Sequence, residues 1–205
     1  MNTPIPDFSG NLLFPIFLRM DKLRILVVGG GLVGTEKILA IYKSSPNAKV
    51  TLVAPEISHE IIALTATCFQ LTLVQKPFDE SDLHNMDLVI AATNIKTLNS
   101  AVKEAAKTRK ILVNVADTPD DCDFYLGSIV KKGDLKLAIS TNGKSPTFAK
   151  RLRETFEEIL PASIQSILDN LSAIRQKMKG DFNDKVEKLN ELTSVLRKSD
   201  HEEKI

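Results

Sequence analysis

The hydrophobic positions along this chain follow two patterns, and the change between them falls near residue 118. Before that point, short apolar runs alternate with segments whose apolar residues recur at helical spacing. This alternation favours parallel strands joined by crossover helices, because parallel neighbours need a long return connection. The nearly all-apolar central runs indicate a sheet covered on both faces. We expect strands within KLRILVVGG, AKVTLVAP, QLTLVQKPF, MDLVIAAT and KILVNVAD, and helices through residues 36–42, SHEIIALTA and LNSAVKEAAKTRK.

After Asp117 the pattern is typical of a hairpin followed by helices. FYLGSIVKKGDLKLAIST has the alternation of two antiparallel strands that turn at residues 132–134. SPTFAKRLRETFEEIL begins with a good N-cap residue and with Pro146 at the first helical position. Two further apolar stripes, over residues 164–178 and 182–196, predict an antiparallel helix pair with a break at Gly180.

These elements predict an α/β fold in which a Rossmann-like, doubly wound parallel sheet is followed by a small α+β segment and a C-terminal helical domain. We place the three parts at residues 1–117, 118–160 and 161–205. The segment FPIFLRM, before the first core run, is expected to add an edge strand beside it. Two strands alone are marginal in water, so the hairpin needs a partner, and a second chain is one candidate.

Composition narrows the functional classes. A net charge of +1 over 205 residues gives no electrostatic case for nucleic acid as the principal partner. No apolar run approaches the length of a membrane span, and the first residues lack the pattern of a secretory signal. Cys68 and Cys122 are isolated thiols without CxxC spacing, and we expect both to be structurally incidental. We therefore predict a cytoplasmic protein with no membrane partner.

The stretch ILVVGGGLVGTEKILA contains the pattern GxGxxG after a strand and before a helix, which is the context in which this pattern is informative. Gly29 permits the tight turn, Gly31 allows a pyrophosphate to approach the backbone, and Gly34 allows the helix to pack closely on the strand. The free N–H groups at the start of the helix favour an anion there. A glycine-rich turn without a ligand is the alternative.

An acidic residue about twenty positions beyond the turn is expected to hold the ribose hydroxyls. Glu56 lies near that place, after Pro55, and no Arg or Lys between Ala54 and Glu60 can receive a 2′-phosphate. NAD is therefore preferred over NADP.

The carboxyl ends of the fourth and fifth expected strands place polar residues at the ligand edge of the sheet. AATN supplies Thr93 and Asn94, and NVAD supplies Asn114 and Asp117. A carboxylate here can take a proton while a hydride leaves to nicotinamide, so Asp117 is the candidate base. An ordinary turn role is equally open, because Asp before Thr-Pro is good turn chemistry.

The loop STNGKSP offers hydroxyls, a flexible glycine, a lysine and a helix N-terminus, which together suit an anion site. Ordinary capping of the following helix by Ser145 is an equally open interpretation. Nearby basic residues can attract a carboxylate-rich substrate or form a solvated helix face. These are Lys144, Lys150, Arg151 and Arg153.

The motifs FPIFL, VVGGGLVGTEK, VTLVAPE, PFDESDL, LVIAATN, VNVAD and STNGKSPTFAKRLRE occur in this order over about residues 15–161. In this set the chain resembles the precorrin-2 dehydrogenases, a family that includes the amino-terminal module of sirohaem synthase. The resemblance implies NAD-dependent oxidation of precorrin-2 to sirohydrochlorin, on the route to sirohaem or cobalamin. It also implies a homodimer in which residues 118–160 are the dimerisation segment, and a substrate with eight carboxylates that the basic cluster suits.

The resemblance also assigns residues. The family's catalytic aspartate falls on Asp117, its nucleotide contacts fall on Leu32, Val33, Pro55 and Glu56, and a serine of its substrate region falls on Ser145. With the residues inferred from the pattern, the expected cofactor site is Gly29, Gly31, Leu32, Val33, Gly34, Pro55, Glu56, Thr93 and Asn94. The expected substrate contacts are Asn114, Asn142, Gly143, Lys144 and Ser145, and no protein-bound metal is expected.

Other functions are open. Some members of the resembled family also insert Fe²⁺ into sirohydrochlorin, and the acidic residues 120–123 can assist metal delivery or be simply solvated. The three histidines have no metal-binding spacing. A dinucleotide-sensing domain that gates potassium transport explains the glycines but makes no demand for Asp117 or the STNGKSP loop. A chelatase without a redox step needs no intact nucleotide turn.

Overall fold

The computed structural model describes residues 10–68, 70–178 and 182–193. The chain forms two compact units. The first contains the chain through Ser128 and residues 139–149, and the second contains residues 129–138 and the chain from Lys150 onward. The expected helix break at Gly180 and the end of the last apolar stripe lie outside the described residues. The division at residues 117 and 160 stays a prediction.

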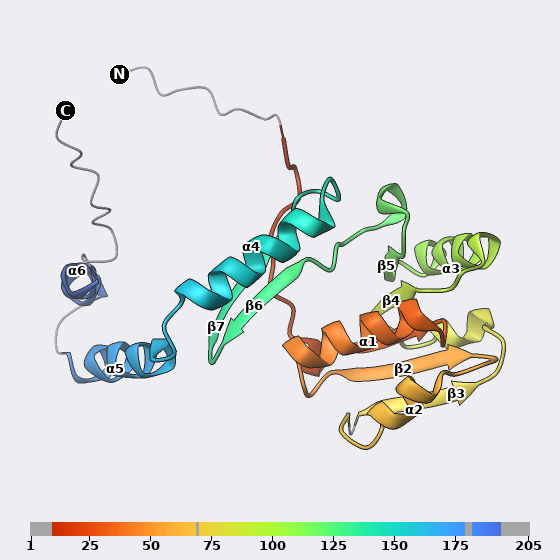
Figure 1. Cartoon of the computed structure of the whole chain (residues 1–205), viewed down its shortest axis with the longest axis horizontal. Helices are drawn as coiled ribbons and strands as arrows, with labels where there is room; N and C mark the ends of the chain where they lie inside the picture. Colours follow the sequence, from red (N-terminus) through yellow and green to blue (C-terminus); the bar gives the residue numbers. More distant parts are fainter. Residues whose placement is uncertain (1–9, 69, 179–181, 194–205) are drawn as a thin grey trace. The chain divides into compact units, whose positions relative to one another are not determined.

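Five parallel strands form the sheet of the first unit, in the order β3-β2-β1-β4-β5 (Figure 1). The chain order reverses between β1 and β4, which is the switch point where open α/β sheets bind ligands. All five apolar runs of the sequence become strands. Their bounds are β1 (Arg24–Val28), β2 (Lys49–Ala54), β3 (Leu71–Gln75), β4 (Leu88–Ala91) and β5 (Leu112–Val115).

Helices cover both faces of this sheet, because alternate strand residues point to opposite sides. Ile25 and Val27 join one core cluster with residues of α1 and α2, whereas Leu26 and Val28 join the other with residues of α3 and η2. The doubly wound α/β fold is therefore confirmed. The elements are α1 (Leu32–Ser44), α2 (His59–Leu64), α3 (Lys96–Thr108) and the 3₁₀ helices η1 (Met20–Lys22), η2 (Glu80–Leu83) and η3 (Pro119–Asp121).

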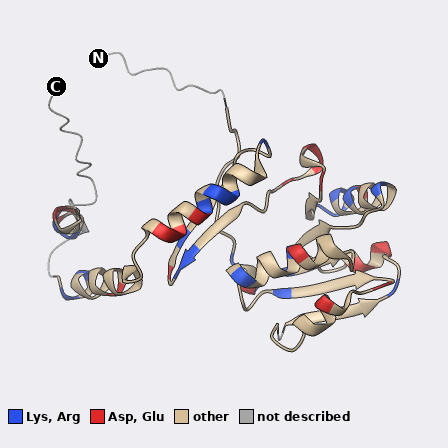
Figure 2. Cartoon of the chain, viewed as in Figure 1, with Lys and Arg blue, Asp and Glu red and all other residues tan. Residues whose placement is uncertain are grey.

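The expected hairpin is confirmed as β6 (Ser128–Lys132) and β7 (Leu135–Ile139), and Gly133 in its turn has φ +59°. Three helices follow: α4 (Pro146–Ile159), α5 (Ile164–Lys177) and α6 (Phe182–Leu192). Within the second unit, the turn is tied to α5 because the Asp134 N–H donates to Gln165 Oε1 at 2.7 Å. Along α4 the basic residues come first and the acidic residues follow toward its C-terminal end (Figure 2).

The edge strand expected in FPIFLRM is wrong. β1 is hydrogen-bonded to β2 on one side and to β4 on the other, so it has no free edge to offer. The described residues 11–19 form neither helix nor strand, and they are exposed. Phe14 is 86% exposed and Phe17 69% exposed, which leaves an apolar segment on the surface. Within the described ranges, no helix is both long and apolar enough to cross a membrane.

Candidate functional site

The glycine turn between β1 and α1 packs too tightly for side chains at two of its motif positions. Gly29 has φ +124°, and a Cβ there would collide with the carbonyl of Ala92 at the end of β4. A Cβ on Gly34 would collide with the Gly29 carbonyl, so this residue sets how closely α1 approaches the turn. The roles expected for these two glycines are thus those of tight turning and close packing.

Gly31 differs from them, because a Cβ on it would meet nothing within 4 Å. It is the N-cap of α1, has no side-chain capping bond, and precedes the helix whose first N–H groups have no intrahelical acceptors. The positive end of a 13-residue helix therefore faces open space. A phosphate group fits this position by both charge and hydrogen bonding.

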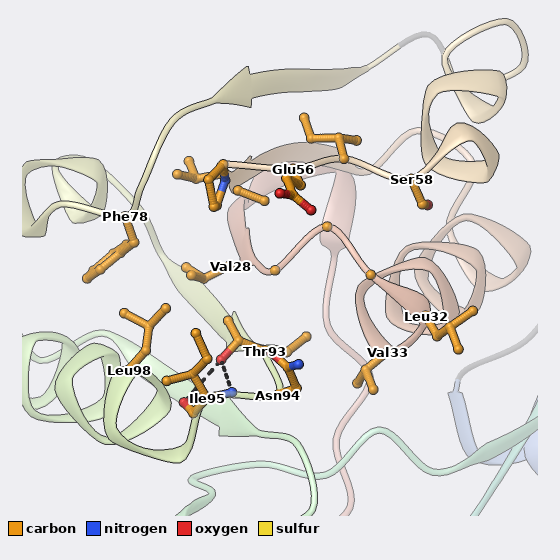
Figure 3. A pocket seen from close by; sticks show the side chains of 18 residues that line it. Val28, Leu32, Val33, Glu56, Ser58, Phe78, Thr93, Asn94, Ile95 and Leu98 are labelled. Atoms are coloured by element: carbon orange, nitrogen blue, oxygen red, sulfur yellow. Dashed lines mark hydrogen bonds between the residues drawn. The ribbon is translucent and has the colours of Figure 1, made fainter.

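A pocket of about 680 Å³ lies in front of this turn, at the carboxyl ends of β1, β2 and β4. Leu32 and Val33 lie toward one end of it, and Phe78 and Leu98 lie toward the other (Figure 3). The wall is mainly apolar, which suits flat rings, and its polar groups are few. Every residue expected to hold the cofactor lines the pocket except Gly34, which lies behind the turn.

Glu56 is exposed, and its carboxylate points toward the glycine turn (Figure 3). Two contacts fix the backbone around it: Gln75 Nε2 donates to the Pro55 carbonyl at 3.2 Å, and Ser58 N–H donates to the Gly30 carbonyl at 2.9 Å. A carboxylate accepts hydrogen bonds from ribose hydroxyls and repels a phosphate. Among the described lining residues none is Lys, Arg or His, so the pocket suits NAD better than NADP.

Several residues of this site were not predicted from the sequence. Gly30 lies outside the GxGxxG positions, yet a Cβ on it would collide with the Glu56 carbonyl. Asn99 of α3 is 6% exposed and holds the turn after β4, because its amide donates to the Thr93 carbonyl at 3.0 Å and accepts from the Thr93 hydroxyl at 2.7 Å. A polar residue on the buried face of a helix was the available signal. Phe78 carried no such signal.

Asp117 lies at the end of the neighbouring strand. Ala116 N–H donates to the carbonyl of Ala91 at 2.9 Å, and Ala92 and Thr93, which follow Ala91, line the pocket. Asp117 itself is exposed, lies outside the lining, and has φ +60°, in the left-handed region that Asp and Asn tolerate better than other side chains. The candidate base is therefore an open carboxylate at the same edge of the sheet as the pocket.

The STNGKSP loop lies against the Asp117 loop within the first unit. A Cβ built on Gly143, which has φ +74°, would be 3.6 Å from Pro119 Cγ. Ser145 caps α4, because its hydroxyl accepts the Phe148 N–H at 3.1 Å. The capping interpretation is thus confirmed, and a substrate role for this loop stays a prediction. Lys144 is exposed.

Several other expected residues have partners in the protein. Asn114 is 7% exposed, and its amide donates to the Phe124 carbonyl at 2.8 Å, so its side chain supports the fold at this edge. In the acidic loop, Asp121 pairs with Lys103 at 2.5 Å and Asp123 accepts the Val113 N–H at 3.0 Å. In the basic cluster, Arg151 pairs with Glu154, and Arg153 pairs with Glu154 and Glu157.

Cys68 behaves as expected, since it is a buried member of the core. Cys122 does not, because its thiol is hydrogen-bonded to β5. Burial raises the pKa of the Cys122 thiol above its ordinary value, and the carboxylates of Asp121 and Asp123 add to this effect. Among the described residues, no three His, Cys, Asp or Glu side chains form a group that can hold a metal ion.

The switch-point pocket, the open helix terminus and the acidic residue beyond β2 define a dinucleotide-binding domain of the Rossmann class. A family model for NAD(P)-binding matches residues 16–128, and one described as the sirohaem biosynthesis protein central region matches residues 132–159. A solved precorrin-2 dehydrogenase, SirC, is 30% identical, with a TM-score of 0.68, and the match covers 88% of this chain and 89% of that one. The chain belongs to the precorrin-2 dehydrogenase family of sirohaem biosynthesis proteins.

Longer relatives contain the same region. The siroheme synthase of Pseudoalteromonas translucida is 40% identical over 82% of this chain and 35% of its own length. That of Thioalkalivibrio sulfidiphilus is 35% identical over 83% of this chain and 34% of its own length. The chain therefore spans about a third of the curated relatives it matches. The potassium-transport alternative is not favoured, because the second family model covers the STNGKSP loop, for which this alternative makes no demand.

Proposed function

We propose that this chain catalyses the NAD-dependent oxidation of precorrin-2 to sirohydrochlorin. One observation carries the proposal: an uncapped helix terminus at the switch-point pocket lies next to a strand end that presents the exposed carboxylate of Asp117. The similarity to a solved precorrin-2 dehydrogenase supports the choice of substrate. The reaction balances as precorrin-2 and NAD⁺ giving sirohydrochlorin, NADH and one proton.

NAD fits the residues of the pocket. The open N–H groups from Gly31 into the first turn of α1 hold the pyrophosphate, and Glu56 accepts from ribose hydroxyls. Phe78 and Leu98 offer apolar surface to a ring. When bound, NAD supplies the acceptor for a hydride. The protein therefore has to hold the two reactants close together and provide a place for the proton.

Asp117 provides that place. Its exposed carboxylate takes a proton from the substrate carbon as the neighbouring hydride departs, and releases the proton to solvent afterwards. The STNGKSP loop binds substrate carboxylates next to it, because Gly143 lies against Pro119 and Lys144 is exposed. The backbone N–H groups of Asn142 and Ser145 donate to side-chain hydroxyls within this loop and so hold its shape.

The active species is a homodimer in the cytoplasm. Residues 12–18 expose several large apolar side chains in the single chain, and a surface of this kind is typical of an interface. Cys68 and Cys122 are both free thiols, which fits a reducing compartment.

The function is tested by anaerobic incubation of the purified chain with precorrin-2 and NAD, following NADH by absorption. We expect one NADH for each precorrin-2 consumed, and no turnover without NAD. The informative variant is Asp117→Asn, because Asn also tolerates the left-handed backbone and so removes the carboxylate alone. Its kcat should fall by about 10²-fold or more, the usual contribution of a general base.

Calorimetric titration with NAD is the control, and Asp117→Asn should bind NAD as the unaltered chain does. Full turnover by Asp117→Asn contradicts the role of this carboxylate, and absence of NADH formation by the unaltered chain contradicts the function. Fe²⁺ added after the oxidation, with the absorption spectrum followed further, tests whether the same chain also inserts metal.

A further inference from the structure

The outer edge of β5 is closed by Cys122 and Asp123 instead of by a sixth strand. β5 is the last strand of its sheet, so the backbone groups on its free side need other partners. Asp123 pairs with both backbone groups of Val113. The backbone N–H of Asp123 donates to the Val113 carbonyl at 2.8 Å, and its carboxylate accepts the Val113 N–H at 3.0 Å.

Cys122 does the same for Val115, two residues further along the strand. Its thiol accepts the Val115 N–H at 3.2 Å and lies 3.2 Å from the Val115 carbonyl, to which it can donate. It also lies 3.4 Å from the Thr118 carbonyl and accepts from the Asn114 amide at 3.4 Å. One thiol therefore contacts the end of β5 and the loop that leaves it.

This contact closes the base of the loop that contains Asp117. The loop leaves β5 after Val115 and returns at Cys122, and Asp117 lies within it at φ +60°. A residue other than glycine keeps a left-handed backbone conformation only where the surrounding structure holds it there. Two more contacts hold the far part of the loop: Lys103 pairs with Asp121, and the Tyr125 hydroxyl donates to the Pro119 carbonyl at 3.1 Å.

We propose that Cys122 is a positioning residue for the reaction, whose thiol clamps the Asp117 loop to the end of β5 and so fixes where the Asp117 carboxylate lies. The inference rests on the proposed function and deepens it. Cys122 acts through Asp117 and touches neither substrate nor cofactor. Its thiol works as a protonated donor and acceptor, and no redox step is involved.

The test combines Cys122→Ala, Cys122→Ser and Asp117→Asn in the precorrin-2 assay. Cys122→Ala removes both sets of hydrogen bonds, and we expect kcat to fall by about 10- to 100-fold, as small displacements of a reacting group do. KM and Kd for NAD should stay unchanged, because Cys122 is not part of the cofactor pocket. Cys122→Ser keeps a donor and an acceptor and should recover part of the lost kcat.

The double variant Cys122→Ala with Asp117→Asn separates positioning from general damage. If Cys122 acts through Asp117, the double variant is as slow as Asp117→Asn alone. Cys68→Ala is the matched control, since it removes the other free thiol, which lies in the core cluster of the opposite sheet face. It should lower the free energy of unfolding and leave kcat as in the unaltered chain.

An unchanged kcat in Cys122→Ala overturns the inference. So does a kcat that Cys122→Ala lowers by the same factor in the Asp117→Asn background as in the unaltered chain. If Cys122→Ala does not fold, Cys122→Ser carries the test alone: it must lose kcat through the shorter reach of its hydroxyl without a change in the KM for NAD. Full activity of Asp117→Asn instead overturns the proposed role of Asp117, which is a separate failure.

Discussion

At the residue scale, the glycines of the turn between β1 and α1 serve two different purposes, close packing of the protein and access for a ligand. Gly29, Gly30 and Gly34 lack side chains because protein atoms occupy the space, whereas Gly31 lacks one where the protein leaves the space open. The spacing GxGxxG assigned Gly31 to a ligand, which stays a prediction, and it could not reveal the packing role of Gly30. That residue is constrained by the segment after β2, through the carbonyl of Glu56.

Replacing Gly31 by Asp should abolish NAD binding while the chain still folds. The backbone there, at φ −93°, is accessible to any residue, and a Cβ meets no protein atom within 4 Å. The new carboxylate would occupy the phosphate position, where two like charges about 4 Å apart repel by about 4 kcal/mol at an effective dielectric constant of about 20. Calorimetry should show at least a tenfold weaker Kd, since about 1.4 kcal/mol corresponds to tenfold.

Gly31→Asn is the matched control, because it has the same shape without the charge and should bind NAD better than Gly31→Asp. Thermal unfolding should be unchanged in both. A variant Gly31→Asp that binds NAD normally would mean that no phosphate group lies at this turn.

At the scale of elements, apolar runs predicted all five strands because β1, β2, β4 and β5 are largely buried, so their sequences are mostly apolar. The turn at Gly133 and the start of α4 at Pro146 followed from residues with strong local preferences. The edge strand failed because pairing is decided by sheet order, which no local pattern contains. The contacts of Cys122 with β5 were missed for the same reason, since they join side chain to backbone across a loop.

Ser145 allows the two roles of the STNGKSP loop to be separated. It caps α4 through the Phe148 N–H, so Ser145→Ala should lower the free energy of unfolding by about 1 kcal/mol, measured by denaturant titration. Ser145→Asp keeps a capping oxygen and should keep the stability of the unaltered chain. If the loop also binds substrate carboxylates, Ser145→Asp should raise the KM for precorrin-2 by repulsion, with Kd for NAD unchanged. An unchanged KM in Ser145→Asp would leave capping as its role.

For the whole molecule, the described chain accounts for a cofactor pocket and a carboxylate within one unit, and for an apolar surface that the single chain leaves uncovered. The hairpin pattern indicated the need for a partner, and the family resemblance assigned the proposed dimerisation to residues 118–160. Exposure adds a second candidate surface, since a large apolar side chain in water loses the free energy that burial would provide. Leu12, Phe14 and Phe17 form such a surface on a segment that has no strand partner in the first unit.

The last prediction concerns this segment. The unaltered chain should sediment with twice the mass of one chain, and the double variant Phe14→Asp with Phe17→Asp should sediment as one chain, because charges replace the side chains that we expect the second copy to bury. Ile62→Asp is the matched control: Ile62 is 48% exposed on α2, and its replacement should leave the dimer intact. Sedimentation of the unaltered chain as a single copy contradicts the dimer. A dimer that survives both Phe substitutions would instead mean that residues 12–18 lie outside the interface, since a buried pair of carboxylates in each chain could not be tolerated there.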